Sequence, residues 1–346
     1  MAKVLVIRAS SFGDVALLVP VVASVAAKYP QDRFSVMTRK AFAPLFENLG
    51  FNINVIPLDL KKRHKGIRGF IRVMRRLIPM RFSHVADVHD VLRSKGVRCS
   101  MFLLGKKTAK IDKGRKEKYD LIASKKLDQP LKHTIERYRE VFDKLGFPAP
   151  MVFNNLFDFV GKDLSLLNAV VTEKEGTWIG VAPFAKHKGK IYPLEKMEKV
   201  VEKLSAQPNT TVFLFGAGKE EQKVLSLWAK KYPNIIDPTG KVNLNKELLL
   251  MSYMDVMLTM DSANMHLASL VQVPVVSIWG ATHPALGFYG FRQDLKNAVQ
   301  IGDLDCRPCS VFGEQPCLRS DYACLNMIKE ETVVDRVNEV IAAKQK

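Results

Sequence analysis

With 346 residues and 47% hydrophobic residues, the chain can bury a large core, and roughly 150 residues per domain predicts two domains. The start, MAKVLVIRAS, has a strand pattern without the features of a signal peptide, so we expect no export. The longest nearly uncharged apolar run has 13 residues and contains Pro20. Because a membrane-spanning helix needs roughly 20, we do not expect the chain to cross a bilayer.

The excess of positive charge lies in the first half of the chain. Residues 1–150 hold 31 Lys and Arg against 13 Asp and Glu, whereas residues 151–346 hold 22 of each. A basic surface that serves only solubility would spread its charge over the whole chain. The asymmetry therefore favours an anionic partner for the N-terminal half.

Short β-branched segments alternate with helical patterns in the first half. We expect strands at residues 2–9, 33–39 and 52–58, and helices at residues 14–30 and 41–50. This alternation is typical of a parallel sheet with crossover helices.

A second alternation follows an irregular stretch near residues 150–176. We expect strands at 177–184, 210–218, 255–261 and 274–280, and helices at 193–206, 219–233, 262–272 and 330–344. The predicted fold class is α/β, with two Rossmann-like, doubly wound parallel-sheet domains. In such sheets ligands bind at the carboxyl ends of strands, so functional residues are expected just after strands.

The first candidate site lies in IRASSFGDVALLVP, residues 7–20, where the first strand gives way to a helix. Asp14 there is either a first-turn acid, stabilised by the helix dipole and free N–H groups, or a general base toward a hydroxyl. Gly13 would let a substrate approach the backbone closely.

A second junction, MDSANMHLAS at residues 260–269, also follows a strand. Asp261 or Ser262 can cap the helix, and the N–H groups of its first turn can bind a phosphate. His266 lies four residues after Ser262, on the same helix face. His266 either has a structural role in packing or contributes to the phosphate site.

Two further loops follow strands of the second half. VAPFAKHKGKIYP, residues 181–193, carries Lys186, Lys188 and Lys190, which are either solvated or neutralise a phosphate leaving group. FLFGAGKEE, residues 213–221, places Glu220 after a glycine-containing turn, where an acid can accept hydrogen bonds from ribose hydroxyls.

The basic segment KKRHKGIRGFIRVMRR, residues 61–76, contains eight Lys or Arg and no acid. On a helix, Arg68, Arg72 and Arg75 share one face, and the apolar residues lie near another face: Ile67, Phe70, Ile71 and Met74. Such a helix is either solvated or contacts an anionic surface.

Four cysteines cluster near the C-terminus in CRPCSVFGEQPCLRSDYAC. A chain in a reducing compartment is not expected to pair them as disulfides. The first two have zinc-ligand spacing but the last two do not, so reduced thiols and a zinc site both remain open, and no catalytic role is assigned. The cysteines of this cluster are Cys306, Cys309, Cys317 and Cys324.

Several motifs, taken together in their order along the chain, resemble the heptosyltransferases of glycosyltransferase family 9, which build the lipopolysaccharide core. The motifs are SSxGDxxxxxP, a Lys shortly before a Pro, G-x-x-x-E, DSxxMHLA and PVVSIWGATHP. DVHDVLRS at residues 87–94 and HTIERYREVFDKLG at 133–146 resemble family segments as well. The resemblance runs from about residue 3 to about residue 340. It implies the GT-B fold, in which two Rossmann-like domains face each other across a cleft.

The resemblance also implies domain roles. Residues 1–165 would form the acceptor-binding domain and residues 166–328 the nucleotide-sugar-binding domain. Residues 329–346 would form a C-terminal helix, and one possible arrangement is that this helix packs back on the first domain. Asp14 would be the base of an inverting transfer, and Lys190 would stabilise the departing diphosphate, with no cofactor and no metal.

Residue by residue, the resemblance assigns two binding sets. The donor set comprises Ala185, Lys186, Lys190, Glu220, Asp261, Ser262, Ala263 and His266. The acceptor set comprises Ser11, Gly13, Arg68, Arg72, Arg93 and His133. The implied donor is ADP-heptose and the implied acceptor is an anionic lipopolysaccharide core or lipid A glycolipid. The enzyme would be cytoplasmic, at the surface of the inner membrane, with no nucleic acid as partner.

The sequence departs from the family around the donor. Ala263 stands where Gly is common, Tyr192 stands where Trp is common, and PFAKHK replaces a loop of small residues. The transferred sugar is therefore left open. A nucleic-acid-binding protein is one alternative, although the basic segment offers only Phe70 to stack on bases. A nucleotide-sugar epimerase of the same architecture is another, and it would leave the basic half unexplained.

Overall fold

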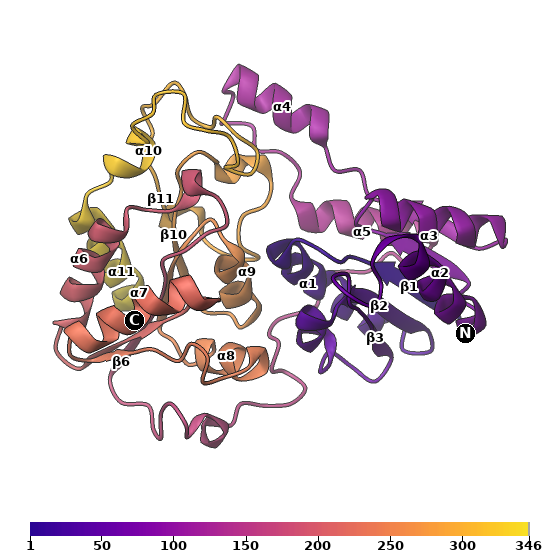
Figure 1. Cartoon of the computed structure of the whole chain (residues 1–346), viewed down its shortest axis with the longest axis horizontal. Coiled ribbons are helices and arrows are strands. Elements are labelled where there is room, and N and C mark those ends of the chain that lie inside the picture. The colour runs from indigo at the N-terminus through magenta and orange to yellow at the C-terminus, as the bar shows by residue number, and fades with distance from the viewer. Residues whose placement is uncertain (345–346) are drawn as a thin grey trace. The chain divides into compact units, whose positions relative to one another are not determined.

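The computed structural model describes residues 1–344, which divide into two compact units. Unit 1 comprises residues 1–113 and 132–161, and unit 2 comprises residues 114–131 and the residues from 162 onward. Each unit is built on its own parallel sheet, and Figure 1 labels many of the helices and strands.

Unit 1 has a five-stranded sheet in the order β3-β2-β1-β4-β5, and all neighbouring strands are parallel. The strands are β1 (Lys3–Ile7), β2 (Arg33–Arg39), β3 (Ile53–Leu58), β4 (His84–Asp87) and β5 (Lys107–Lys110). The helices are α1 (Phe12–Lys28), α2 (Gly66–Leu77), α3 (Leu92–Leu103) and α5 (Thr134–Leu145).

Helix α1 is central to unit 1 because it is apolar on nearly every side. All its residues from Val15 to Ala26 are buried, and the helix packs against α5 and strand β2. A helix that is hydrophobic all round has to be covered on all faces. This burial fixes the first turn of α1, which carries Asp14, at the carboxyl end of β1.

Unit 2 has a six-stranded parallel sheet in the order β11-β10-β9-β6-β7-β8. Its strands are β6 (Thr177–Ala182), β7 (Thr210–Leu214), β8 (Ile235–Ile236), β9 (Val256–Met260), β10 (Val275–Ile278) and β11 (Ala298–Val299). Its helices are α4 (Arg115–Ser124), α6 (Leu194–Ser205), α7 (Lys219–Lys231), α8 (Leu244–Met251), α9 (Ala263–Leu270), α10 (Ala323–Asn326) and α11 (Glu330–Lys344).

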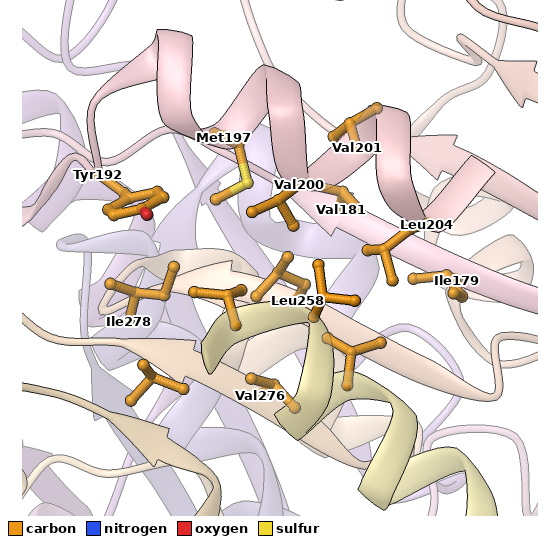
Figure 2. Packing of buried hydrophobic residues seen from close by; sticks show 14 of the residues in the cluster. Ile179, Val181, Tyr192, Met197, Val200, Val201, Leu204, Leu258, Val276 and Ile278 are labelled. Atoms are coloured by element: carbon orange, nitrogen blue, oxygen red, sulfur yellow. The ribbon is translucent and has the colours of Figure 1, made fainter. Parts of the chain in front are cut away.

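Figure 2 shows the main core of unit 2, where α6 and side chains of the central strands meet. Val200 of α6 lies over Leu258 of β9, and both are fully buried. Tyr192 is also fully buried, and its hydroxyl donates a hydrogen bond of 3.0 Å to the Ile328 carbonyl. The buried phenol is accommodated because its hydroxyl finds a polar partner.

The units differ from the expected domains in two places. Residues 114–131 belong to unit 2, because Leu121 of α4 packs with Ala285 and Leu286 and the Leu131 amide donates to the Ala285 carbonyl at 2.8 Å. Helix α11 is part of unit 2, where it packs on α6 and the strands through buried valines, so the expected second domain and C-terminal helix form one unit. Residues 345 and 346 of the expected C-terminal helix lie outside the described residues.

One local expectation is also corrected. The helix expected at 41–50 is a 3-10 helix, Lys40–Phe46, that contains Pro44, which lacks the N–H group an α-helix needs. In α2 the buried residues are Gly69, Val73, Met74 and Leu77, whereas Ile67 and Ile71 are exposed. Between residues 1 and 344, no helix has both the length and the apolar character to cross a membrane.

Candidate active site

Asp14 lies in the first turn of α1, directly after β1, and its carboxylate has three polar contacts. Arg8 forms an ion pair with Oδ2 at 2.6 Å, and the Ser11 amide and hydroxyl donate to the same oxygen at 3.1 and 2.7 Å. Burial alone would raise the pKa of Asp14, but Arg8 and Ser11 outweigh it and lower that pKa to about 2. The carboxylate is therefore ionised at neutral pH, while 33% of its side chain stays exposed.

The structural interpretation of Asp14 is thus confirmed: it is a first-turn acid that closes a capping box with Ser11. The contacts of this capping box use only Oδ2 of the Asp14 carboxylate. A capping acid needs no arginine partner, yet Arg8 is buried and reaches Asp14 from the end of β1 while its Nη1 donates to the Val88 carbonyl at 2.6 Å. Gly13 lies within the first turn of α1 rather than before it.

Two side chains near Asp14 were missed in the sequence analysis. Tyr138 of α5 is fully buried, lies beneath the Arg8 guanidinium at 5.7 Å and donates to the Asp14 carbonyl at 3.1 Å. His89 is 3.1 Å from the Ser10 hydroxyl, and burial, followed by the charge of Arg8, lowers the pKa of His89 to about 3. The imidazole is therefore neutral, and it can exchange hydrogen bonds without adding charge.

The expected acceptor residues lie at different places in unit 1. Arg68 and Arg72 are exposed on α2, while Arg93, in the first turn of α3, donates to the His64 carbonyl. His133 is the N-cap of α5, and its Nδ1 accepts from the Ile135 amide at 3.2 Å. His133 thus has an evident structural role, and Arg72 donates to the Arg63 carbonyl, whereas Arg68 is exposed on the surface of α2.

In unit 2, Lys190 and Asp261 form an ion pair of 2.7 Å at the carboxyl ends of β6 and β9, which are neighbours in the sheet. Both side chains are largely buried. The Thr282 hydroxyl donates to the same Asp261 oxygen at 2.7 Å. The Lys190 ammonium, held by the Asp261 carboxylate, therefore lies beside the N-terminus of the helix that follows Asp261.

That helix is α9, and Ser262 is its N-cap residue without a side-chain capping bond. The Ser262 hydroxyl lies 3.1 Å from the Thr259 hydroxyl instead. The first N–H groups of a helix have no intrahelical partner and attract anions. Ala263 begins α9, and His266 is buried in it one turn after Ser262.

The remaining donor candidates are less enclosed. Ala185 is half-buried, and Lys186 is exposed in the same loop as Lys190. Glu220, in the first turn of α7, is also exposed and pairs with Lys223 at 2.9 Å, whereas Glu221 accepts from the Ala217 amide at 2.7 Å. Glu221 thus holds the turn before α7, and the Glu220 carboxylate projects into solvent.

The cysteine cluster lies in one place. All four cysteines line a cavity of about 10 Å³, and they are free thiols. Burial raises the pKa of Cys309 and raises the pKa of Cys324 to about 11, so both are protonated at neutral pH. Over residues 1–344, no group of three or more His, Cys, Asp or Glu side chains is placed to hold a metal ion.

Comparison with a solved structure establishes the fold class. The structure of ADP-heptose LPS heptosyltransferase II of E. coli superposes with a TM-score of 0.73 over 99% of this chain and 100% of that chain, at 18% sequence identity. At this identity the likeness establishes the fold alone, which is the GT-B fold of glycosyltransferases. The predicted fold class, two parallel-sheet α/β domains of GT-B type, is confirmed.

The chain belongs to glycosyltransferase family 9 (heptosyltransferase), whose family model matches residues 71–315. Lipopolysaccharide core heptosyltransferase OpsX of Haemophilus influenzae is 23% identical over 302 residues, which is 81% of this chain and 79% of that protein. Lipooligosaccharide heptosyltransferase 2 of Campylobacter jejuni is 26% identical over 136 residues, which is 37% of this chain. That match spans only 40% of the Campylobacter protein. Family membership favours the glycosyltransferase interpretation over the nucleic-acid-binding and epimerase alternatives.

Proposed function

We propose that this chain transfers a heptose from ADP-heptose to an anionic lipopolysaccharide core or lipid A acceptor, with inversion at the anomeric carbon, at the cytoplasmic face of the inner membrane. The E. coli protein of the same fold is named for ADP-heptose and lipopolysaccharide. The Haemophilus relative is named for the lipopolysaccharide core. These names support the donor and the acceptor class.

The observation that carries the proposal is the Lys190–Asp261 pair beside the N-terminus of α9. A leaving diphosphate accumulates negative charge as its bond to the sugar breaks. It needs fixed positive charge and N–H donors rather than a nucleophile. Lys190 and the first turn of α9 supply both, with Asp261 holding the ammonium in place. Glu220, exposed after the β7 turn, is the proposed ribose ligand.

On the acceptor side, Asp14 is the proposed general base. The acceptor oxygen forms a bond to the anomeric carbon while the bond from that carbon to the phosphate oxygen breaks, and the hydroxyl proton passes to Asp14. A carboxylate with a pKa of about 2 is a weak base toward a free alcohol. The hydroxyl becomes strongly acidic as its oxygen bonds to the anomeric carbon, so proton transfer late in the reaction needs only an ionised carboxylate in position.

The charge distribution supports an anionic acceptor at unit 1. This unit holds 26 Lys and Arg against 11 Asp and Glu, whereas unit 2 holds 27 against 24. On α2, the exposed Arg68 and Arg72 alternate with Ile67 and Ile71, which are 79% and 45% exposed. Basic side chains with apolar neighbours suit a membrane interface that carries anionic headgroups.

Calorimetry with ADP, UDP, GDP and ADP-heptose tests the donor side. We expect selective binding of ADP and ADP-heptose, weakened at least about tenfold by Lys190→Ala because a charged hydrogen-bond donor to phosphate is lost. Lys188→Ala is the matched control, because Lys188 of the same loop lies over the Tyr322 ring, 5.0 Å from its centroid. Preference for UDP or GDP would replace the proposed donor. Binding of none, with salt-sensitive binding of RNA, would refute the function.

A further inference from the structure

The cysteine loop, defined here as residues 306–324, packs against the loop that carries Lys190. The Cys309 amide donates to the Ala281 carbonyl at 3.0 Å, and the Ala281 amide donates to the Gly189 carbonyl at 2.8 Å. The backbone next to Lys190 is therefore connected to the cysteine loop through one residue of the segment that follows β10.

Gly313, within the cysteine loop, is in direct contact with the Lys190 side chain. A Cβ atom added at Gly313 would lie 2.5 Å from Cγ and 2.8 Å from Cδ of Lys190. Gly313 also has a φ of +77°, a conformation that favours glycine. The missing side chain thus leaves the space through which the stem of Lys190 runs toward Asp261.

Arg307 holds the other partner of the ion pair through a chain of hydrogen bonds. It is 4% exposed, and it donates to the Gly280 carbonyl at 2.6 Å and to the Thr282 carbonyl at 2.9 Å. The Thr282 hydroxyl in turn donates to Asp261, which pairs with Lys190. Loss of Arg307 would leave buried carbonyls without their donor, which is costly at such a site.

We propose that Gly313 and Arg307 are positioning residues that fix the Lys190 ammonium against Asp261, so that the cysteine loop sets the geometry of the donor diphosphate site. The inference rests on the proposed function for the identity of the ligand. The position of the Lys190 ammonium against Asp261 is a property of the unliganded chain. Two measurements therefore test the positioning of Lys190 separately from the identity of the ligand.

The first measurement is ADP binding by calorimetry to Gly313→Ala and to Gly161→Ala. Gly161 is the matched control because its φ is +72° and an added Cβ there meets nothing within 4 Å, so it reproduces the backbone strain alone. We expect Gly313→Ala to weaken ADP binding about tenfold and Gly161→Ala to change it less than about twofold. In a Lys190→Ala background, Gly313→Ala should have no further effect, because it acts through Lys190.

The second measurement needs no nucleotide. Acetylation of the lysines of the free protein, quantified by mass spectrometry, should label Lys190 about threefold faster in Gly313→Ala and in Arg307→Lys than in the wild type, because its ion pair is loosened. Lys188 should be labelled at an unchanged rate. Equal Lys190 labelling in all variants would overturn the inference.

An additive effect of Gly313→Ala on ADP binding in the Lys190→Ala background would also overturn the inference, since it would mean general damage to the loop. If the wild type binds no ADP, the proposed function fails while the labelling still decides whether the cysteine loop positions Lys190. Thermal melts of each variant identify any that do not fold. If Gly313→Ala does not fold, the rate of Lys190 labelling in Arg307→Lys decides the inference instead.

Discussion

Replacement of Asp14 with Asn tests the acceptor chemistry most directly. Asn keeps an oxygen that can accept from Ser11, but it carries no charge for Arg8 and cannot take a proton from the acceptor hydroxyl. We expect kcat to fall at least about 100-fold, within the range for general acid–base groups. The Kd for ADP-heptose should change less than about twofold, because the proposed donor residues lie in the other unit.

The same substitution has a calculable effect on stability. The pKa of Asp14 is lowered from 3.8 to about 2, so its ionised form stabilises the folded chain above pH 3.8, and this is lost as the pH falls through 2. The shift corresponds to roughly 2 kcal/mol, and partial exposure reduces it to about 1 to 2 kcal/mol. Asp14→Asn should therefore lower the Tm by about 2 to 8 °C at pH 7. The difference from the wild type should shrink toward pH 2.

The assay is release of ADP in the presence of ADP-heptose and a deacylated lipopolysaccharide acceptor, at a temperature well below both melting transitions. Asp143→Asn is the control, because Asp143 is an exposed acid on α5 of the same unit. It should keep the wild-type kcat. Turnover by Asp14→Asn within tenfold of the wild type would refute the assignment of Asp14 as the base.

Three further predictions follow from the structure. Arg8→Met removes the counter-ion of Asp14, so burial raises the pKa of that carboxyl, and the acid limb of the kcat/KM profile should move up by about 1 to 3 pH units; an unmoved limb would contradict the pairing. Leu258→Ala should lower the free energy of unfolding by about 2 to 5 kcal/mol in urea titrations, and an unchanged midpoint would contradict its packing. Arg68→Glu should weaken binding to anionic phospholipid vesicles about tenfold, whereas Lys230→Glu on α7 should not; equal losses would argue against α2 as the contact.

Much of the fold is visible in local sequence patterns. β-branched runs such as KVLVI and TWIGVA are buried strands, and polar turns follow them, so two parallel sheets and the placement of Asp14 and Asp261 at strand ends could be predicted. These features depend on neighbouring residues only. The sequence pattern could not predict the order of strands, because order depends on contacts between distant segments.

The surroundings of Asp14 illustrate that limit. His89 follows β4 and Tyr138 comes from α5, and both approach Asp14 because β4 pairs with β1 and α5 packs on α1. Two signals for them were present in the sequence. Arg8 is a charged residue directly after the apolar run VLVI, and both His89 and Tyr138 lie within segments that resemble the family.

The placement of α4 in unit 2 could not be predicted from local sequence patterns either, because it depends on contacts with distant residues. Nothing in residues 115–124 indicates a partner, because Ala285 and Leu286, which cover Leu121, are more than 150 residues away in the chain. The predicted first domain therefore runs without interruption to residue 165. In the structure, the chain enters unit 2 for residues 114–131 and returns to unit 1 at residue 132.

The placement of residues 114–131 in unit 2 has a consequence for synthesis on the ribosome. Residues 114–131 emerge in the middle of unit 1, but their partners in unit 2 are translated more than 150 residues later. At roughly 5 to 20 residues per second, α4 waits about 8 to 30 s with Leu121 uncovered. Unit 1 can complete its sheet in that interval, since β1 to β5 precede residue 114. Unit 2 then packs against a helix that was made long before it, so an N-terminal fragment that ends at residue 165 would leave Leu121 without the unit 2 residues that cover it.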